Sequence, residues 1–176
     1  MRSALNETSP DNIALIDDER HFTYGDLAQR IDRLAGGLLA GASDLEEARV
    51  AFLIPASVDY VIALHGVWRA GGIAIPLNVV STESEWEHCL TSAGVKRLLT
   101  TEANRGSIEG LCDRLSISLL LVDEVGVDGP ATLPDLAPER RAMIVFTSGT
   151  TSKPKGAVTT HGNIAAQIST LVDAWA

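Results

Sequence analysis

The stretch at residues 146–156, FTSGTTSKPKG, brings five hydroxyl side chains, two glycines and two lysines into eleven positions. Hydroxyls donate hydrogen bonds, and glycines let backbone N–H groups approach a ligand closely. Successive loop amides can form a concave site for an anion, and lysine suits phosphate as a point charge. Pro154 fixes one backbone angle and should hold the spacing between Lys153 and Lys155. The stretch therefore predicts a phosphate cradle between two strands.

Two common nucleotide-binding patterns do not describe this stretch. The pattern G-x-x-x-x-G-K-[ST] fails because Pro154 stands five residues after Gly149, and Ala157 follows Gly156. The pattern G-x-G-x-x-G does not occur in the chain. A polar turn without a ligand is the alternative, because threonine, serine, glycine and proline are ordinary turn residues.

The longer stretch FTSGTTSKPKGAV resembles the signature of the adenylate-forming superfamily, which comprises acyl- and aryl-CoA synthetases, peptide-synthetase adenylation domains and luciferases. The family pattern is an aromatic residue followed by T-S-G-T-T-G-x-P-K-G, and here Ser152 replaces the second glycine. Two upstream segments are also similar to the family and occur in its order. FTYGDL (22–27) is similar to L-T-Y-x-E-L, and WRAGGIAIPLN (68–78) is similar to L-K-A-G-x-x-Y-V-P-L-N. The ending P-L-N favours acid–CoA ligases, and TTHGNI with TLVDAWA resembles in part the malonyl-CoA synthetase branch.

The resemblance implies a two-step reaction. A carboxylate attacks the α-phosphate of Mg·ATP to give an acyl-adenylate and pyrophosphate, and the thiolate of CoA then displaces AMP. The stretch would hold the β- and γ-phosphates, and its donors would offset the charge that builds on the leaving pyrophosphate. The resemblance implies these phosphate ligands: Thr147, Ser148, Gly149, Thr150, Thr151 and Lys155. Thr150, or else Thr147, would also help to place Mg²⁺. No residue of this chain is assigned as catalytic.

Ser152 is the one departure from the signature. If the family glycine at this place needs a positive φ, a serine there is strained by about 1 kcal/mol or more. The loop would still form.

Several family motifs are not found in the chain: a Y-G-x-T-E segment, a ribose-binding aspartate motif, a hinge and a C-terminal catalytic lysine. We therefore expect residues 1–176 to be the N-terminal fragment of the large AMP-binding domain, without the rest of that domain or the C-terminal lid domain, and inactive alone. The alternatives are a noncatalytic α/β module or assembly partner that self-associates and binds phosphate weakly, and an adenylation domain of another acyl-activating enzyme. The acid stays open among malonate, fatty acids and aryl acids.

Short apolar runs alternate with segments of helical periodicity along the chain. This alternation predicts an α/β fold with a mostly parallel sheet, helices on both faces and a small N-terminal hairpin. The hairpin is predicted within 13–27, and 124–140 is predicted to be a surface connection. The predicted strands are 49–55, 73–78, 95–101, 117–123, 142–149 and 156–161, and the predicted helices are 27–38, 57–72, 82–94, 104–115 and 162–176.

Composition limits the class of protein and its partners. The net charge of −9 disfavours nonspecific binding to nucleic acid or to an anionic membrane. The N-terminus lacks the apolar segment of a signal peptide, and no apolar run reaches the ~18 residues of a membrane span. These features predict a cytoplasmic protein. Cys89 and Cys112 are expected to be reduced, half-buried thiols, and His65 and His161 to be packing residues.

Overall fold

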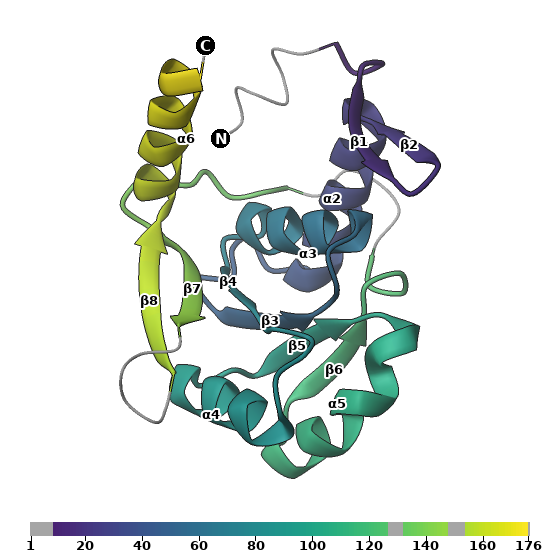
Figure 1. Cartoon of the computed structure of the whole chain (residues 1–176), viewed down its shortest axis with the longest axis vertical. Helices are drawn as coiled ribbons and strands as arrows, with labels where there is room; N and C mark the ends of the chain where they lie inside the picture. The colour runs from purple at the N-terminus through teal and green to yellow at the C-terminus, as the bar shows by residue number, and fades with distance from the viewer. Residues whose placement is uncertain (1–8, 127–131, 148–153, 176) are drawn as a thin grey trace.

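The computed structural model describes residues 9–126, 132–147 and 154–175. Its centre is a six-stranded sheet with the strand order β6-β5-β3-β4-β7-β8, and Figure 1 shows helices on both sides of it. The strands of this sheet are β3 (Arg49–Leu53), β4 (Ile73–Pro76), β5 (Arg97–Thr100), β6 (Ser118–Leu121), β7 (Arg141–Thr147) and β8 (Lys155–Thr160). All neighbouring pairs are parallel except β7 and β8, which are antiparallel. The predicted mostly parallel α/β sheet is confirmed.

The predicted N-terminal hairpin is confirmed as a separate antiparallel pair, β1 (Ile13–Asp17) and β2 (Arg20–Thr23). Asp18 turns the chain with a φ of 54°, a left-handed conformation that aspartate adopts more readily than most residues. The carboxylate of Asp17 accepts a hydrogen bond of 3.1 Å from the backbone of Val58, which ties the hairpin to the next helical layer.

Five helices accompany the strands in the described part of the chain. They are α2 (Tyr24–Leu39), α3 (Val58–Arg69), α4 (Glu83–Ala93), α5 (Glu102–Leu115) and α6 (His161–Trp175). The limits of α4 follow from its capping residues. Thr82 and Glu85 form the predicted capping box at the start of α4, and Gly94 ends the helix with a φ of 63°. The fourth predicted helix begins two residues earlier than expected, at Glu102.

Two apolar cores lie on opposite faces of the sheet. Strand β3 contributes to both of them, because its side chains alternate: Val50 and Phe52 join α2 and α3, whereas Ala51 and Leu53 join α4 and α5. All four of these residues are at most 1% exposed. Burial on both faces explains why the strand is apolar without alternation in the sequence.

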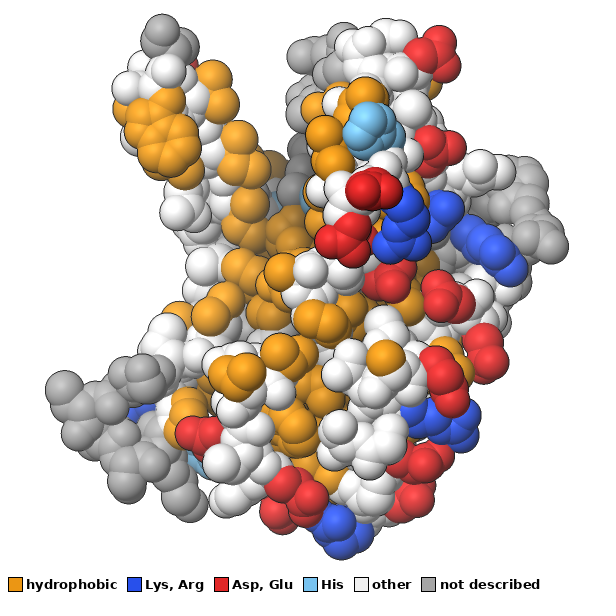
Figure 2. All heavy atoms as spheres, turned by 45° about the vertical axis from the view of Figure 1, so that its right-hand side comes forward, with side chains coloured by type: hydrophobic (Ala, Val, Ile, Leu, Met, Phe, Trp, Pro, Cys, Tyr) orange, Lys and Arg blue, Asp and Glu red, His pale blue; other side chains and the backbone are white. Residues whose placement is uncertain are grey.

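Helix α6 packs only at its beginning. Ile164 lies against the α2–α3 core, but none of the described residues of α6 is buried. Large apolar side chains are exposed along the rest of the helix, namely Ile168, Leu171, Val172 and Trp175. Figure 2 shows hydrophobic side chains along α6 beside a hollow that separates it from the hairpin and α2. Within the described ranges, none of the helices combines the length and apolar character that crossing a membrane requires.

Candidate functional site

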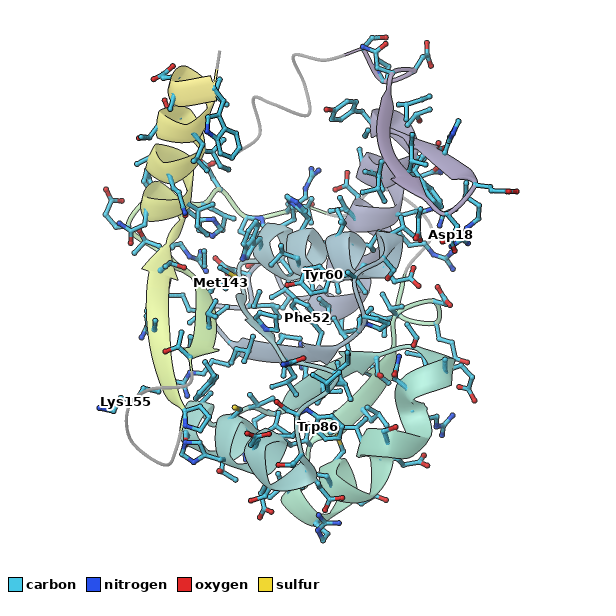
Figure 3. The ribbon with its side chains drawn as sticks, in the orientation of Figure 1. Asp18, Phe52, Tyr60, Trp86, Met143 and Lys155 are labelled. Atoms are coloured by element: carbon cyan, nitrogen blue, oxygen red, sulfur yellow. The ribbon has the colours of Figure 1, made fainter. Side chains whose placement is uncertain are left out.

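The predicted phosphate-binding stretch joins β7 to β8. The last residue of β7, Thr147, pairs with the first residue of β8, Lys155, so the two side chains leave neighbouring strands at the same place. Both are exposed, and Figure 3 shows Lys155 at the outer edge of the hairpin, its side chain directed away from the sheet. The other predicted phosphate ligands lie outside the described residues: Ser148, Gly149, Thr150 and Thr151. The Mg²⁺ role of Thr150 and the strain at Ser152 also stay predictions.

Three contacts fix the beginning of β7. The indole N–H of Trp68 on α3 donates to the carbonyl of Ala142 across 2.7 Å. The side chain of Arg141 donates to Glu47, and Arg140 forms an ion pair with Asp44 in the loop before β3. Hydrogen bonding by the Arg140 guanidinium holds the pKa of Asp44 below its usual range. The strand that carries Thr147 is therefore anchored to both the α3 layer and the α2–β3 connection.

The opposite end of the hairpin is held by α4. Nε2 of His88 lies 2.9 Å from the carbonyl oxygen of Pro154, and the imidazole ring meets Phe146 edge-on with ring centroids 6.4 Å apart. Phe146 and Pro154 stand immediately before Thr147 and immediately before Lys155. The side chain of His88 thus contacts the end of β7, at Phe146, and the residue before β8, Pro154.

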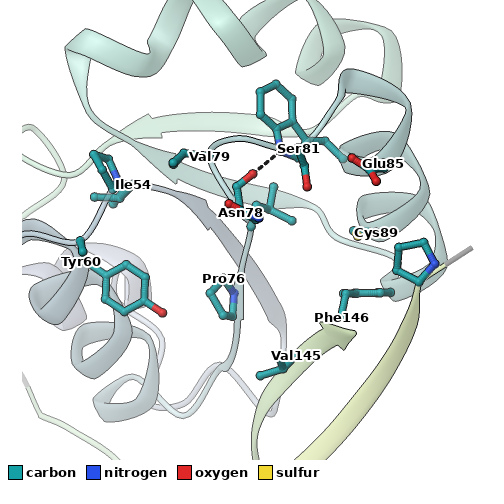
Figure 4. Close-up of a pocket in the computed structure, with 15 residues that line it drawn as sticks. Ile54, Tyr60, Pro76, Asn78, Val79, Ser81, Glu85, Cys89, Val145 and Phe146 are labelled. Atoms are coloured by element: carbon teal, nitrogen blue, oxygen red, sulfur yellow. Dashed lines mark hydrogen bonds between the residues drawn. The ribbon is translucent and has the colours of Figure 1, made fainter. Parts of the chain in front are cut away.

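A cavity of about 520 Å³ lies beside these contacts. Figure 4 shows Ile54, Pro76 and Val145 around it; Ile54 directly follows β3, and Pro76 and Val145 belong to the adjacent parallel strands β4 and β7. The chain leaves β3 toward α3 on one face and leaves β4 toward α4 on the other, because α3 and α4 belong to different cores. Diverging connections open a crevice at the carboxyl edge of a parallel sheet, which is where such sheets bind ligands.

Apolar and polar groups both line the cavity, and Tyr60, Asn78, Ser81 and Glu85 supply polar side chains among its described lining residues. Among the lining residues that the structure describes, Glu85 is the one carboxylate, and its hydrogen bonds with Thr82 lower its pKa. The indole N–H of Trp86 donates to the carbonyl of Asn78 across 2.8 Å, which fixes the segment after β4 (Figure 4). Burial raises the pKa of the Cys89 thiol and of the Tyr60 hydroxyl, so both stay protonated near neutral pH.

The two histidines predicted to pack do so. The ring of His65 lies edge-on to Trp68 with centroids 5.2 Å apart, and the ring of His161 meets the same indole at 5.9 Å. Burial, followed by the charge of Arg140, lowers the pKa of His161. Cys89 and Cys112 are free thiols, and both are buried rather than half-buried.

Comparison with known proteins places the chain in a family. The family model described as AMP-binding enzyme matches residues 2–176. The chain belongs to the AMP-binding enzyme family. The fold agrees, since apo MatB from Rhodopseudomonas palustris matches 97% of this chain and 36% of its own with a TM-score of 0.83 at 26% identity. The structure thus corresponds to the N-terminal part of the large domain of adenylate-forming enzymes.

Curated AMP-binding relatives include acid–CoA ligases. The mouse protein named malonate–CoA ligase ACSF3, mitochondrial, is 36% identical over 180 residues, which cover 94% of this chain and 30% of the mouse protein. The Arabidopsis thaliana protein named malonate–CoA ligase is 30% identical over 202 residues, which cover 99% of this chain and 33% of the plant protein. The chain spans about a third of the length of these relatives.

Two features of this candidate site are not predicted from the sequence. His88 carries no motif, and its contact with Pro154 joins residues 66 positions apart. The cavity combines residues from strand ends that the sequence separates widely. The predicted parallel sheet is the signal from which the cavity could have been inferred, because the residues after β3 and β4 must meet at one edge of such a sheet.

Proposed function

We propose that this chain is the N-terminal portion of an ATP-dependent acid–CoA ligase and that it carries the phosphate-binding stretch of that enzyme. The observation that supports this is that the stretch between β7 and β8 lies next to the cavity at the carboxyl edge of the sheet. Phe146 and Pro154, which belong to the stretch, both line the cavity. A triphosphate held at the stretch would therefore lie beside a space for further parts of the substrates.

In the proposed reaction, a carboxylate oxygen of the acid bonds to the α-phosphorus of ATP and the bond to pyrophosphate breaks. The sulfur of CoA then bonds to the acyl carbon, and AMP leaves with the electron pair of the broken bond. The ammonium group of Lys155 and the hydroxyl of Thr147 would hold the phosphates, together with donors from Ser148 to Thr151. Fixed donors of this kind favour the charge that develops on the leaving group.

Magnesium fits this scheme as a companion of the nucleotide. Mg²⁺ prefers oxygen ligands and commonly keeps waters while it bridges substrate phosphates. The described residues contain no group of three or more His, Cys, Asp or Glu side chains that could hold a metal. A threonine hydroxyl, at Thr150 or Thr147, would add one oxygen ligand to those of the phosphates. Bound Mg²⁺ would supply neutralisation of phosphate charge.

Malonate is the acid to test first, because the mouse and Arabidopsis relatives are named malonate–CoA ligases. The measurement is exchange of labelled pyrophosphate into ATP by the complete protein that contains this chain. Malonate, acetate, palmitate and benzoate are compared at equal concentration. Acid-dependent exchange is the expected result, and its absence with every carboxylate class would contradict the proposal.

Lys155→Ala tests the role of the stretch in the same assay. Loss of a charged donor to phosphate should reduce the exchange rate about 10- to 100-fold. Lys96→Ala is the matched control, because Lys96 is also an exposed lysine but follows α4 and lies outside the hairpin. An exchange rate for Lys155→Ala equal to that of Lys96→Ala would remove Lys155 from the site.

A noncatalytic assembly role is the second candidate, and the exposed apolar face of α6 favours it. Leu171, Val172 and Trp175 are 40%, 60% and 82% exposed. In this role the face would pack against the same face of a second copy of the chain. Sedimentation of the 176-residue chain at several concentrations tests this role. A concentration-dependent dimer that Trp175→Ser abolishes supports it, and a monomer at all concentrations rules it out.

The cytoplasm remains the compartment we propose, on the sequence features alone. The mouse relative is named as a mitochondrial protein. Fractionation of cells that express the complete protein would distinguish the two compartments.

A further inference from the structure

His88 is placed to control the geometry of the phosphate-binding stretch from outside it. The residue lies on α4, and its ring is half-buried between that helix and the β7–β8 hairpin. It reaches the hairpin at two points, the carbonyl of Pro154 and the ring of Phe146. The ring centroids of His88 and Phe146 are 6.4 Å apart with an angle of 75° between the rings, an edge-to-face arrangement that aromatic pairs prefer.

The direction of the hydrogen bond to Pro154 follows from its chemistry. A carbonyl oxygen only accepts, so Nε2 of His88 must carry the hydrogen and donate it. Nδ1 is then the acceptor of the neutral ring, and the hydroxyl of Ser92 lies 3.3 Å from it as a donor. Ser92, one helical turn further along α4, thus favours the tautomer that the contact with Pro154 needs.

Holding the carbonyl of Pro154 also holds Lys155. The C=O of Pro154 and the N–H of Lys155 belong to the same planar peptide unit, so fixing one fixes the plane that contains the other. Lys155 in turn pairs with Thr147 across the hairpin, and Phe146 next to Thr147 packs on the same imidazole. One side chain therefore sets the positions of both described members of the predicted phosphate site.

We infer that His88 is a positioning residue for phosphate binding, acting through the Pro154 carbonyl on Lys155 and through Phe146 on Thr147. The inference rests on the proposed function, because it assumes that this stretch binds the phosphates. Its physical basis is that donors act fully only when they are placed before the ligand arrives. In this role His88 acts through Pro154 and Phe146 and would not itself contact the substrate.

The test uses the 176-residue chain and inorganic tripolyphosphate with Mg²⁺, with binding measured by calorimetry. His88→Phe keeps an aromatic ring against Phe146 but removes the donor, and we expect about three- to tenfold weaker binding, as for loss of one hydrogen bond. His88→Gln presents an amide N–H near the position of Nε2 and should restore most of the affinity. Glu87→Gln, at an exposed neighbour on α4, is the control and should bind like the unchanged chain.

Two further readouts separate positioning from loss of folding. The amide signal of Lys155 in a ¹H–¹⁵N spectrum should shift in His88→Phe without ligand and return toward its original place in His88→Gln. The melting temperature of each variant is also measured. If weaker binding came only from a general loss of stability, the order of the affinities would follow the order of the melting temperatures. If His88→Phe does not fold, Ser92→Ala replaces it and should weaken binding in the same direction by a smaller factor.

The outcomes distinguish the two proposals. An unchanged chain that does not bind tripolyphosphate overturns phosphate binding by this stretch, and the role of His88 falls with it. If the unchanged chain binds tripolyphosphate and His88→Phe binds it with the same affinity, the role of His88 alone is overturned. Binding lost equally in His88→Phe and His88→Gln contradicts the hydrogen bond as the means of positioning.

Discussion

Arg140 and Asp44, 96 positions apart in the sequence, meet through two parallel hydrogen bonds of 2.8 and 2.5 Å. The same guanidinium donates to the carbonyl of Gly71 across 2.8 Å. These contacts join the loop before β3, the turn before β4 and the start of β7. They fix the first residue pairs of the hairpin that carries Thr147 and Lys155. Two-point pairing of arginine with a carboxylate gives orientation as well as energy.

Asp44→Asn should lower the free energy of unfolding at pH 7 by about 1 to 2 kcal/mol. The side chains of Arg140 and Asp44 are 20% and 24% exposed, so water weakens the pair only in part. Because the folded pKa of Asp44 is lowered, its stabilisation is complete above the unfolded pKa of about 3.9 and is lost as pH falls through the folded pKa. Denaturant unfolding at pH 7 and pH 3 measures the difference, which should shrink at the lower pH. Glu19→Gln, at an exposed turn residue, is the control.

Thr82→Ala should destabilise the protein by about 1 kcal/mol, because it removes the side-chain acceptor of the α4 capping box. Thr101 holds the same position before α5 but makes no such bond to the helix backbone. Thr101→Ala should therefore cost clearly less. Urea unfolding of both variants measures the contrast, and equal losses would show that the capping box contributes nothing beyond the residue type.

Two glycines on helices should respond in opposite ways to alanine. A Cβ at Gly37 on α2 would lie 2.7 Å from the backbone nitrogen of Gly126, so Gly37→Ala must displace the chain after β6 and should destabilise by about 1 to 3 kcal/mol. At Gly106 on α5 a Cβ would meet nothing within 4 Å. Gly106→Ala should therefore stabilise the protein by up to about 1 kcal/mol through helix propensity. Thermal unfolding measures both, and a stable Gly37→Ala protein would be inconsistent with the close approach.

Both cysteines should resist alkylation while the protein is folded. Burial raises the pKa of Cys112 to about 11, and it also raises that of Cys89. Because the thiolate is the nucleophile, each group stays in its unreactive protonated form at pH 8. Mass spectrometry after treatment with iodoacetamide should find no adduct in buffer and two in denaturant. Fast labelling of Cys89 in buffer would contradict this expectation. It would indicate that the reagent reaches the thiol through the cavity and that burial does not keep the thiol protonated.

Much of the fold follows from local patterns. The apolar runs of β3 and β4 identify buried strands, and the capping residues Thr82 and Gly94 mark the limits of α4. The weaker signals gave less accurate limits: α5 begins before its predicted first residue, and most predicted strands are longer than those observed. Strand ends are set by hydrogen bonds to neighbouring strands, which the sequence of one segment does not contain.

The sequence by itself determined the family signature at 146–156, the alternation of strands and helices, and the parallel character of the sheet. These depend on residue type and on spacing within one segment. Only the tertiary structure decided that β7 lies beside β4, that Asp44 holds Arg140, and that His88 reaches Pro154. Each of these contacts joins segments far apart in the chain, and their partners are selected by the packing of two cores around β3 rather than by any local preference.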